Sequence, residues 1–275
     1  MTKDGSSAHL ASMHRILLLN AFACTLGISV LGAQAPISAA YTFTEQSFAP
    51  VVQALPEPVR AAVLANPKAF LDDYKPLLTQ PADLLILVDK NNEIPADYEP
   101  DDLVTLKAPA FPANHPGIRF RKVYLPPLKL LLDASKKAGL KLTISSGYRS
   151  WIYQKDLFQR YVAKDGLATA ERYSARPGRS QHQLGTVLDF GSVTPEFADT
   201  KEGRWLAEHA EDAGFSMSFP EGQETLTGYI FEPWHFRYIG IQACAVQKKW
   251  FGDLQQWLTE FHRTQGPILR ASLKK

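Results

Sequence analysis

This sequence has few cysteines, no large excess of charge of either sign and no internal repeats. Only two cysteines are present, and Cys24 lies in an apolar N-terminal stretch, so Cys244 would have no disulfide partner once that stretch is removed. The formal net charge is +2, which gives no support for nucleic-acid binding, because that function usually shows a strong basic excess. A chain without disulfides must be stabilised by its hydrophobic core, and roughly 235 residues can bury one.

Residues 1–40 predict a secretory signal peptide. Basic residues up to Arg15 precede an apolar stretch over residues 16–32, and small residues follow up to Ala40. This order is typical of signal peptides, so we expect an exported protein of the periplasm or cell envelope, with cleavage near Tyr41. The alternative is an uncleaved anchor, since the stretch is at the lower edge of a membrane-spanning length. The membrane would then be contacted only through this segment.

Residues 41–85 predict a short helical extension before the main domain, which we place at residues 86–275. Apolar residues recur there at helical spacing, and each pattern ends near a Pro or Asn. The compact apolar run Leu84–Asp89 predicts a buried strand, and residues 91–116, rich in Pro, Asp and Asn, predict an extended covering loop. The helices predicted in the extension are Val51–Leu55, Pro58–Leu64 and Ala69–Leu78.

From Val123 onward, helix and strand patterns alternate. Separate short strands between helices predict an α+β fold with a small antiparallel sheet flanked by helices. Pro126 fits the first turn of a helix, and Gly139 and Gly214 fit helix C-caps. The predicted strands are Leu140–Ser145, Thr186–Phe190, Tyr229–Phe231 and Phe236–Ile239. The predicted helices are Pro126–Ala138, Ser150–Ala163, Ala168–Tyr173, Glu202–Ala213 and Ala243–Arg263.

Three short polar segments concentrate the groups that could carry chemistry. They are Ser145–Ser150, Ser180–Asp189 and Glu232–Tyr238. A catalytic zinc site needs three protein ligands of N or O type and one open position, and these segments supply two imidazoles and two carboxylates. A carboxylate such as Asp189 inside an apolar strand is costly to bury unless it is paired or metal-bound. Each residue also has a structural interpretation, as a cap, a salt bridge or core packing, so spacing alone leaves both open.

The three segments resemble the motifs of the VanY-type D-alanyl-D-alanine carboxypeptidases, part of the wider group that also holds lysostaphin and Sonic hedgehog. The pattern S-x-H-x-x-G-x-A-x-D falls on Ser180 to Asp189, with Val187 in place of the usual Ala. The pattern E-x-W-H falls on Glu232 to His235, and S-G-Y-R-S falls on Ser146 to Ser150. The resemblance covers roughly residues 84–240, and the three motifs occur together and in order.

The resemblance implies a zinc-dependent peptidase that trims peptidoglycan stem peptides. Glu232 would act as the general base, and Arg149 would steady the substrate carbonyl or carboxylate. One zinc ion per chain would lie in a cleft, held by His182, Asp189 and His235. The side chains expected at the substrate site are Ser180, Gln154 and Tyr148.

The expected activity is removal of one C-terminal D-alanine, although L,D-carboxypeptidase and endopeptidase activities remain open alternatives on the same scaffold. A catalytically silent zinc-bearing binding module is a further alternative. A serine-type penicillin-binding hydrolase is disfavoured, because neither Ser146 nor Ser180 has a Lys three residues later. His209 stands where the family often has Asn, and its helical setting favours a place away from the metal.

Overall fold

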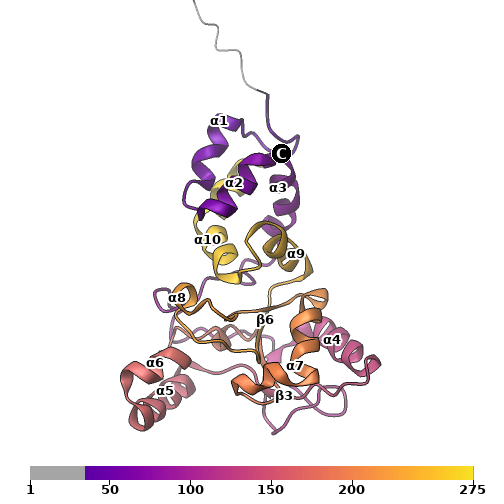
Figure 1. The fold of residues 1–275 in the computed structure, drawn as a ribbon, viewed down its shortest axis with the longest axis vertical. Helices are drawn as coiled ribbons and strands as arrows, with labels where there is room; N and C mark the ends of the chain where they lie inside the picture. Colours follow the sequence, from indigo (N-terminus) through magenta and orange to yellow (C-terminus); the bar gives the residue numbers. More distant parts are fainter. Residues whose placement is uncertain (1–34, 275) are drawn as a thin grey trace, which may run out of the picture. The chain divides into compact units, whose positions relative to one another are not determined.

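The computed structural model describes residues 35–274, so the predicted signal segment lies outside the described residues apart from residues 35–40. No helix within the described part of the chain is both long and apolar enough to cross a membrane. The described residues form one compact unit. This unit has two large hydrophobic cores, one among the N- and C-terminal helices and one beneath a sheet. Figure 1 shows the N- and C-terminal helices gathered at one end of the unit and the sheet at the other.

Short helices occupy residues 45–79, within the predicted N-terminal extension. Thr44 caps the first helix by accepting the backbone N–H of Ser47. Pro67 occupies the first position of another helix, where its missing N–H has no intrahelical partner to lose. The α-helices are α1 (Glu45–Phe48), α2 (Glu57–Ala65) and α3 (Pro67–Tyr74), with 3-10 helices at Ala49–Val52 and Lys75–Thr79.

The prediction of one C-terminal helix over Ala243–Arg263 is wrong. Gly252 and Asp253 have φ angles of 59° and 62°, which a right-handed helix cannot contain. The chain instead forms α9 (Ile241–Trp250) and α10 (Gln255–Ala271). Both pack on the extension, where the Phe70 ring centroid lies 5.6 Å from that of Trp250. Extension and C-terminal helices thus share one core, while the domain boundary at residue 85 stays a prediction.

The apolar run Leu84–Asp89 is buried but is not a strand, so that prediction is wrong. Two of its carbonyl groups are hydrogen-bonded by a side chain rather than by a neighbouring strand. Arg237 Nη2 donates to the carbonyl oxygens of Leu84 and Ile86 at 2.9 and 2.8 Å. An antiparallel hairpin follows, of which the first strand lies in the predicted covering loop. Its strands are β1 (Leu103–Thr105) and β2 (Arg119–Arg121).

The main sheet has four antiparallel strands in the order β3-β4-β6-β5, which confirms the predicted α+β class. Leu188 stands opposite Phe236, and both belong to the core beneath the sheet. The next pair, Asp189 and His235, faces the other side, because side chains alternate along a strand. The strands are β3 (Ile144–Ser146), β4 (Val187–Phe190), β5 (Phe215–Met217) and β6 (His235–Tyr238).

Two groups of helices surround the main sheet, one on its core face and one beside it. On the core face, α4 (Leu125–Lys137) contacts α7 (Lys201–His209), and a 3-10 helix at Ala210–Ala213 follows (Figure 1). The pair α5 (Trp151–Asp165) and α6 (Leu167–Tyr173) packs together, and α8 (Glu224–Thr227) is a single turn. The predicted strand Tyr229–Phe231 is wrong, since Ile230 N–H donates to the Arg172 carbonyl in a loop.

Candidate active site

The strand register places two of the predicted metal ligands side by side. Asp189 on β4 stands opposite His235 on β6, and Asp189 Oδ1 lies 3.4 Å from His235 Nδ1. Both side chains are buried. The apolar neighbours of this pair fill the core on the opposite face, so the alternation of the strands alone directs the two polar groups to one side of the sheet.

A short 3-10 helix, Gln181–Leu184, brings His182 to this pair. Ser180 Oγ caps the helix by accepting the backbone N–H of His182 at 3.3 Å. His182 Nδ1 lies 2.7 Å from the Gly147 carbonyl oxygen, so this nitrogen carries the ring proton and donates it. The other ring nitrogen, Nε2, is then free of a proton and lies 3.4 Å from Asp189 Oδ2.

The three side chains form a closed donor set that fits one metal ion. One ligand atom from each lies within 4.8 Å of the others, and the His182 and His235 rings are perpendicular with centroids 4.9 Å apart. Asp189 Oδ1 is buried and has no hydrogen-bond partner among the described residues, which is costly unless a cation completes it. Two imidazole nitrogens and one carboxylate oxygen are typical donors of catalytic zinc sites.

Burial and neighbouring charges set the protonation of these ligands. Burial, followed by the Arg149 cation, lowers the pKa of His182 to about 4, so this ring is neutral at neutral pH. Burial alone would raise the pKa of Asp189, but His182, His235 and Arg149 bring it well below its ordinary value. Burial also opposes protonation of His235, yet its carboxylate neighbours raise its pKa. A metal ion would take the place of that proton.

Glu232 lies beside this donor set, three residues before His235. The backbone N–H of His235 donates to the Glu232 carbonyl at 3.1 Å, and this turn brings Glu232 Oε2 to 3.3 Å from His235 Nδ1. The side chain is only 5% exposed, and burial raises its pKa. A buried carboxylate with a raised pKa next to a metal donor set has the properties of a general base.

Arg149 follows β3 and borders the donor set. Its Nη2 lies 2.9 Å from both Asp189 Oδ2 and His182 Nε2, and its Nε donates to Ser146 Oγ at 3.1 Å. The preceding Gly147 has no room for a side chain, because a Cβ there would lie 2.4 Å from a backbone oxygen of β2. The contacts with Ser146, His182 and Asp189 hold the guanidinium in place, and Arg149 also lines the cleft.

Comparisons with known proteins agree with this geometry. A family model for VanY, D-alanyl-D-alanine carboxypeptidase, matches residues 117–241. The chain is 31% identical over 191 residues to the bifunctional D-Ala-D-Ala dipeptidase and D-Ala-D-Ala carboxypeptidase VanXYC of Enterococcus gallinarum, a match that covers 65% of this chain and 93% of that protein. This chain belongs to the VanY D-alanyl-D-alanine carboxypeptidase family.

Solved structures of other members resemble this fold. A mutant of the vancomycin-resistance D,D-pentapeptidase VanY, in complex with Zn(II), gives a TM-score of 0.54 at 32% identity, covering 65% of this chain and 98% of that one. The LdcB LD-carboxypeptidase gives 0.57 at 33% identity, covering 70% and 87%. The chain spans 64% of a Bacillus subtilis relative at 36% identity and 60% of a D-alanyl-D-alanine carboxypeptidase of Enterococcus faecalis at 34% identity.

The three substrate residues implied by the VanY motifs lie in different environments. Ser180 lines the cleft as well as capping its helix. Gln154 is buried behind Arg149, with its Oε1 3.4 Å from Arg149 Nη1, and it does not line the cleft. Tyr148 does not line the cleft either, because its hydroxyl donates to Glu99 Oε2 at 2.9 Å. Contact with substrate stays a prediction for all three.

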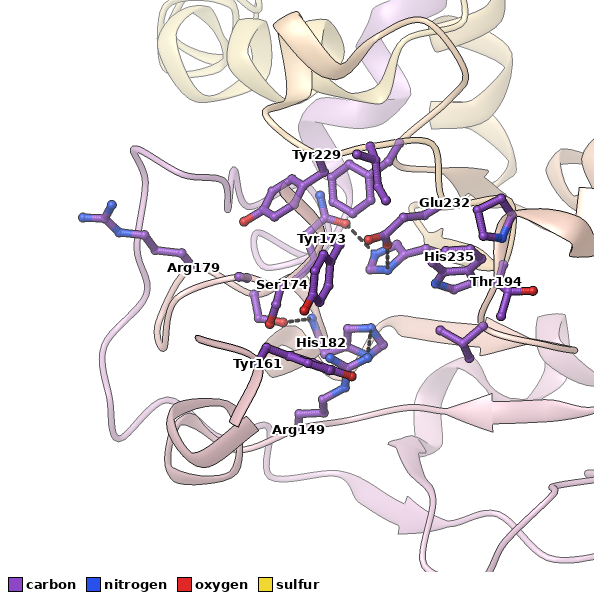
Figure 2. Close-up of a pocket in the computed structure, with 18 of the residues that line it drawn as sticks. Arg149, Tyr161, Tyr173, Ser174, Arg179, His182, Thr194, Tyr229, Glu232 and His235 are labelled. Atoms are coloured by element: carbon purple, nitrogen blue, oxygen red, sulfur yellow. Dashed lines mark hydrogen bonds and ion pairs between the residues drawn. The ribbon is translucent and has the colours of Figure 1, made fainter. Parts of the chain in front are cut away.

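The donor set of His182, Asp189 and His235 opens into a cleft of about 390 Å³. In Figure 2, His182 lies below Glu232 and His235, and all three residues line the cleft. Tyr173 and Tyr229 contribute to its walls. Sequence reasoning missed both tyrosines, because they lie outside the three family motifs in a helix end and a loop.

Gln181 is a further residue at the site to which sequence reasoning assigned no role. Its Oε1 lies 3.4 Å from His235 Nε2 and accepts a hydrogen bond from Ser218 Oγ at 2.7 Å. Ser218 Oγ also lies 3.2 Å from Gln255 Oε1 on α10. An acceptor at Nε2 keeps the proton on that nitrogen and leaves Nδ1 free for a metal. The C-terminal helix, beyond the part matched by the VanY model, thus supports the site.

Proposed function

We propose that this chain is a zinc-dependent carboxypeptidase that removes the C-terminal D-alanine from peptidoglycan stem peptides ending in D-Ala-D-Ala. The observation that carries the proposal is the buried donor set of His182, Asp189 and His235 with Glu232 beside it in a cleft. Relatives named as D-alanyl-D-alanine carboxypeptidases support it, as does the similar VanYB structure in complex with D-alanine-D-alanine.

The chain's own groups would hold the metal through His182 Nε2, His235 Nδ1 and the Asp189 carboxylate. The Gly147 carbonyl and the Gln181 side chain orient the two imidazoles by accepting from their other nitrogens. When bound, zinc supplies Lewis-acid polarisation of the scissile carbonyl.

Two further side chains act on the substrate. The Glu232 carboxylate takes a proton from the attacking water at Oε2 and delivers it to the leaving amine. Its raised pKa increases its affinity for that proton. The Arg149 guanidinium donates hydrogen bonds to negative charge on the substrate, either the developing oxyanion or the terminal carboxylate.

L,D-Carboxypeptidase activity is the second candidate, because the LdcB LD-carboxypeptidase resembles this chain at a TM-score of 0.57. The two activities differ in the configuration of the residue before the cleaved bond, and the same donor set can serve both. Mass spectrometry of defined stem peptides separates them. D,D activity shortens pentapeptides to tetrapeptides, whereas L,D activity shortens tetrapeptides to tripeptides.

The metal assignment is tested by elemental analysis of purified protein. We expect about one zinc per chain, loss of activity with a chelator and recovery with added zinc. Single Ala substitutions at His182, Asp189 and His235 should each remove the metal. Full zinc occupancy in all three variants would show that the ligands lie elsewhere.

The proposed carboxypeptidase activity is tested with a pentapeptide acid and its C-terminal amide. If Arg149 binds the terminal carboxylate, the amide should be cleaved about 10- to 100-fold less efficiently, the scale of a charge-assisted hydrogen bond. Arg149→Lys should also lose activity, because an ammonium cannot reproduce the planar fork of donors. Equal rates on acid and amide would favour an endopeptidase instead.

We also propose that the protein is exported and acts in the periplasm or cell envelope. The basic, apolar and small-residue order of residues 1–40 supports this location, and so does a peptidoglycan substrate. Cell fractionation with N-terminal sequencing tests it. Recovery of intact residues 16–32 in the membrane fraction would instead indicate an anchored form.

A further inference from the structure

A second, smaller cavity of about 140 Å³ adjoins the catalytic cleft. Its walls are Lys90, Glu171, Ser174, Arg176, Arg179 and Tyr229. Ser174, Arg179 and Tyr229 line the catalytic cleft as well, so a substrate lying in the cleft can extend a side chain into this cavity. In Figure 2 the Arg179 guanidinium points away from the two histidines.

The cavity is positively charged. Three cationic side chains and one carboxylate line it, which leaves a formal excess of two positive charges. The single carboxylate, Glu171, pairs with Arg176 at 2.5 Å. The charges of Lys90 and Arg179 are therefore the ones left to attract an anion.

Backbone carbonyls fix these two cations without neutralising them. Lys90 Nζ donates to the Glu171 carbonyl oxygen at 2.7 Å and lies 4.8 Å from the centre of the Tyr229 ring. Arg179 Nη1 donates to the Lys90 carbonyl oxygen at 2.5 Å. The ion pair of Arg179 with the exposed Glu93 is long, at 3.6 Å. In the part of the chain that the structure describes, Lys90 has no ion pair, and burial lowers its pKa.

A carboxylate would complete this arrangement. It would place a negative charge between two positioned cations, with the Ser174 and Tyr229 hydroxyls as additional donors. A side chain that ends in an ammonium group without a carboxylate beside it would be repelled there. Arg149 already stands beside the metal donor set, where the terminal carboxylate of the substrate would lie. The smaller cavity therefore suits a different carboxylate, and in a carboxypeptidase substrate that group must belong to a residue before the cleaved bond.

We infer that the cavity of Lys90, Arg176 and Arg179 binds a side-chain carboxylate of the peptide substrate, carried by a residue on the amino-terminal side of the cleaved bond. This inference rests on the proposed carboxypeptidase function. It assigns the preferred substrate class as stem peptides in which diaminopimelate, rather than lysine, precedes D-Ala-D-Ala. Lysine differs from diaminopimelate only by lacking the side-chain carboxyl group.

The test compares three D-Ala-D-Ala peptides that carry diaminopimelate, its side-chain amide or lysine at the preceding residue. We expect kcat/KM to be about tenfold higher for diaminopimelate than for its amide, mainly through KM, because the contact is made in ground and transition states alike. Arg179→Gln should reduce that ratio to about two. Glu171→Gln should increase it, because this change removes the competing carboxylate.

Arg172→Gln is the matched control. Arg172 pairs with the exposed Glu224 and lines neither cavity, so the ratio should stay at its wild-type value. Equal kcat/KM for diaminopimelate and its amide in the wild type would overturn the inference. A preference that survives Arg179→Gln, or that falls equally with Arg172→Gln, would overturn it too.

Direct binding separates this inference from the proposed function. The shortened peptides, ending in one D-alanine, are titrated calorimetrically into the zinc-loaded protein. Tighter binding of the diaminopimelate peptide that depends on Arg179, with no hydrolysis of any peptide, would support the cavity and reject the carboxypeptidase. Hydrolysis of all three peptides with equal binding affinities would reject the cavity and keep the carboxypeptidase.

Discussion

Replacing Gln181 by Met should weaken metal binding more than it weakens the fold. The change keeps side-chain length but removes the oxygen that accepts from Ser218 and lies 3.4 Å from His235 Nε2. Without that acceptor the His235 proton is no longer held on Nε2, and protonation at Nδ1 competes with the metal. Loss of an orienting partner typically costs 10- to 100-fold in metal affinity, and we expect about this loss for zinc.

The stability cost should be modest. Ser218 Oγ can turn fully to Gln255 Oε1, 3.2 Å away, so no hydroxyl donor is left without a partner. The free energy of unfolding of the metal-free protein should therefore fall by about 1–2 kcal/mol, close to the net value of one hydrogen bond. Urea denaturation measures this change, and competition with a chromophoric chelator measures zinc affinity.

Gln183→Met is a matched control on the same 3-10 helix. Gln183 is fully buried and donates to the carbonyl oxygens of Pro95 and Tyr98, away from the metal ligands. It should lose a similar amount of stability and bind zinc as the wild type does. Wild-type zinc affinity in Gln181→Met, or equal losses of affinity in both variants, would refute the orienting role.

Three other predictions concern different parts of the molecule. Glu232→Gln should fold and bind zinc but turn over at least about 10²-fold more slowly, and near-normal turnover would move the base elsewhere. His262 is partly buried against Tyr74, and burial lowers its pKa to about 4, so its neutral form is favoured in the fold. The unfolded chain therefore binds a proton at His262 at a higher pH than the folded chain does, and the free energy of unfolding should fall by about 2 kcal/mol as the pH drops from 6.5 to 4. Denaturation of His262→Gln should show a flatter dependence of this free energy on pH. Buried Ser38 donates a hydrogen bond to a carboxylate on α3, so a chain that starts at Tyr41 should melt roughly 2–4 °C below one that starts at residue 35. Equal melting temperatures would contradict this.

The sequence predicts those parts of the site that lie within one motif. Strand alternation around Asp189 and the turn after Glu232 are local, so their placement follows from a few neighbouring residues. The pairing of Asp189 with His235 is not local. It depends on a register between β4 and β6 that no spacing in the sequence encodes, and only the family resemblance could indicate it.

The missed features depend on contacts between distant segments. The break before α10 needs Asp253 at positive φ, a conformation that the helical periodicity of Ala243–Arg263 conceals. The buried run Leu84–Asp89 has the composition of a strand, yet a side chain from β6 donates to two of its carbonyl oxygens. Gln255 reaches the site from a helix outside the family motifs, and its neighbours in the sequence give no sign of that role.

Arg237 joins residues 84–86 to β6 and so affects which parts of the molecule unfold locally together. Burial lowers its pKa to about 10, so the guanidinium still carries its charge at neutral pH, and two backbone carbonyls of residues 84–86 solvate it. Detaching that segment would leave an unsolvated cation on the strand that bears His235, at a cost similar to breaking a buried ion pair. The segment and β6 should therefore exchange their amide hydrogens with solvent together, as one cooperative opening. The metal ligand and the link to the N-terminal helices would then be lost in the same event.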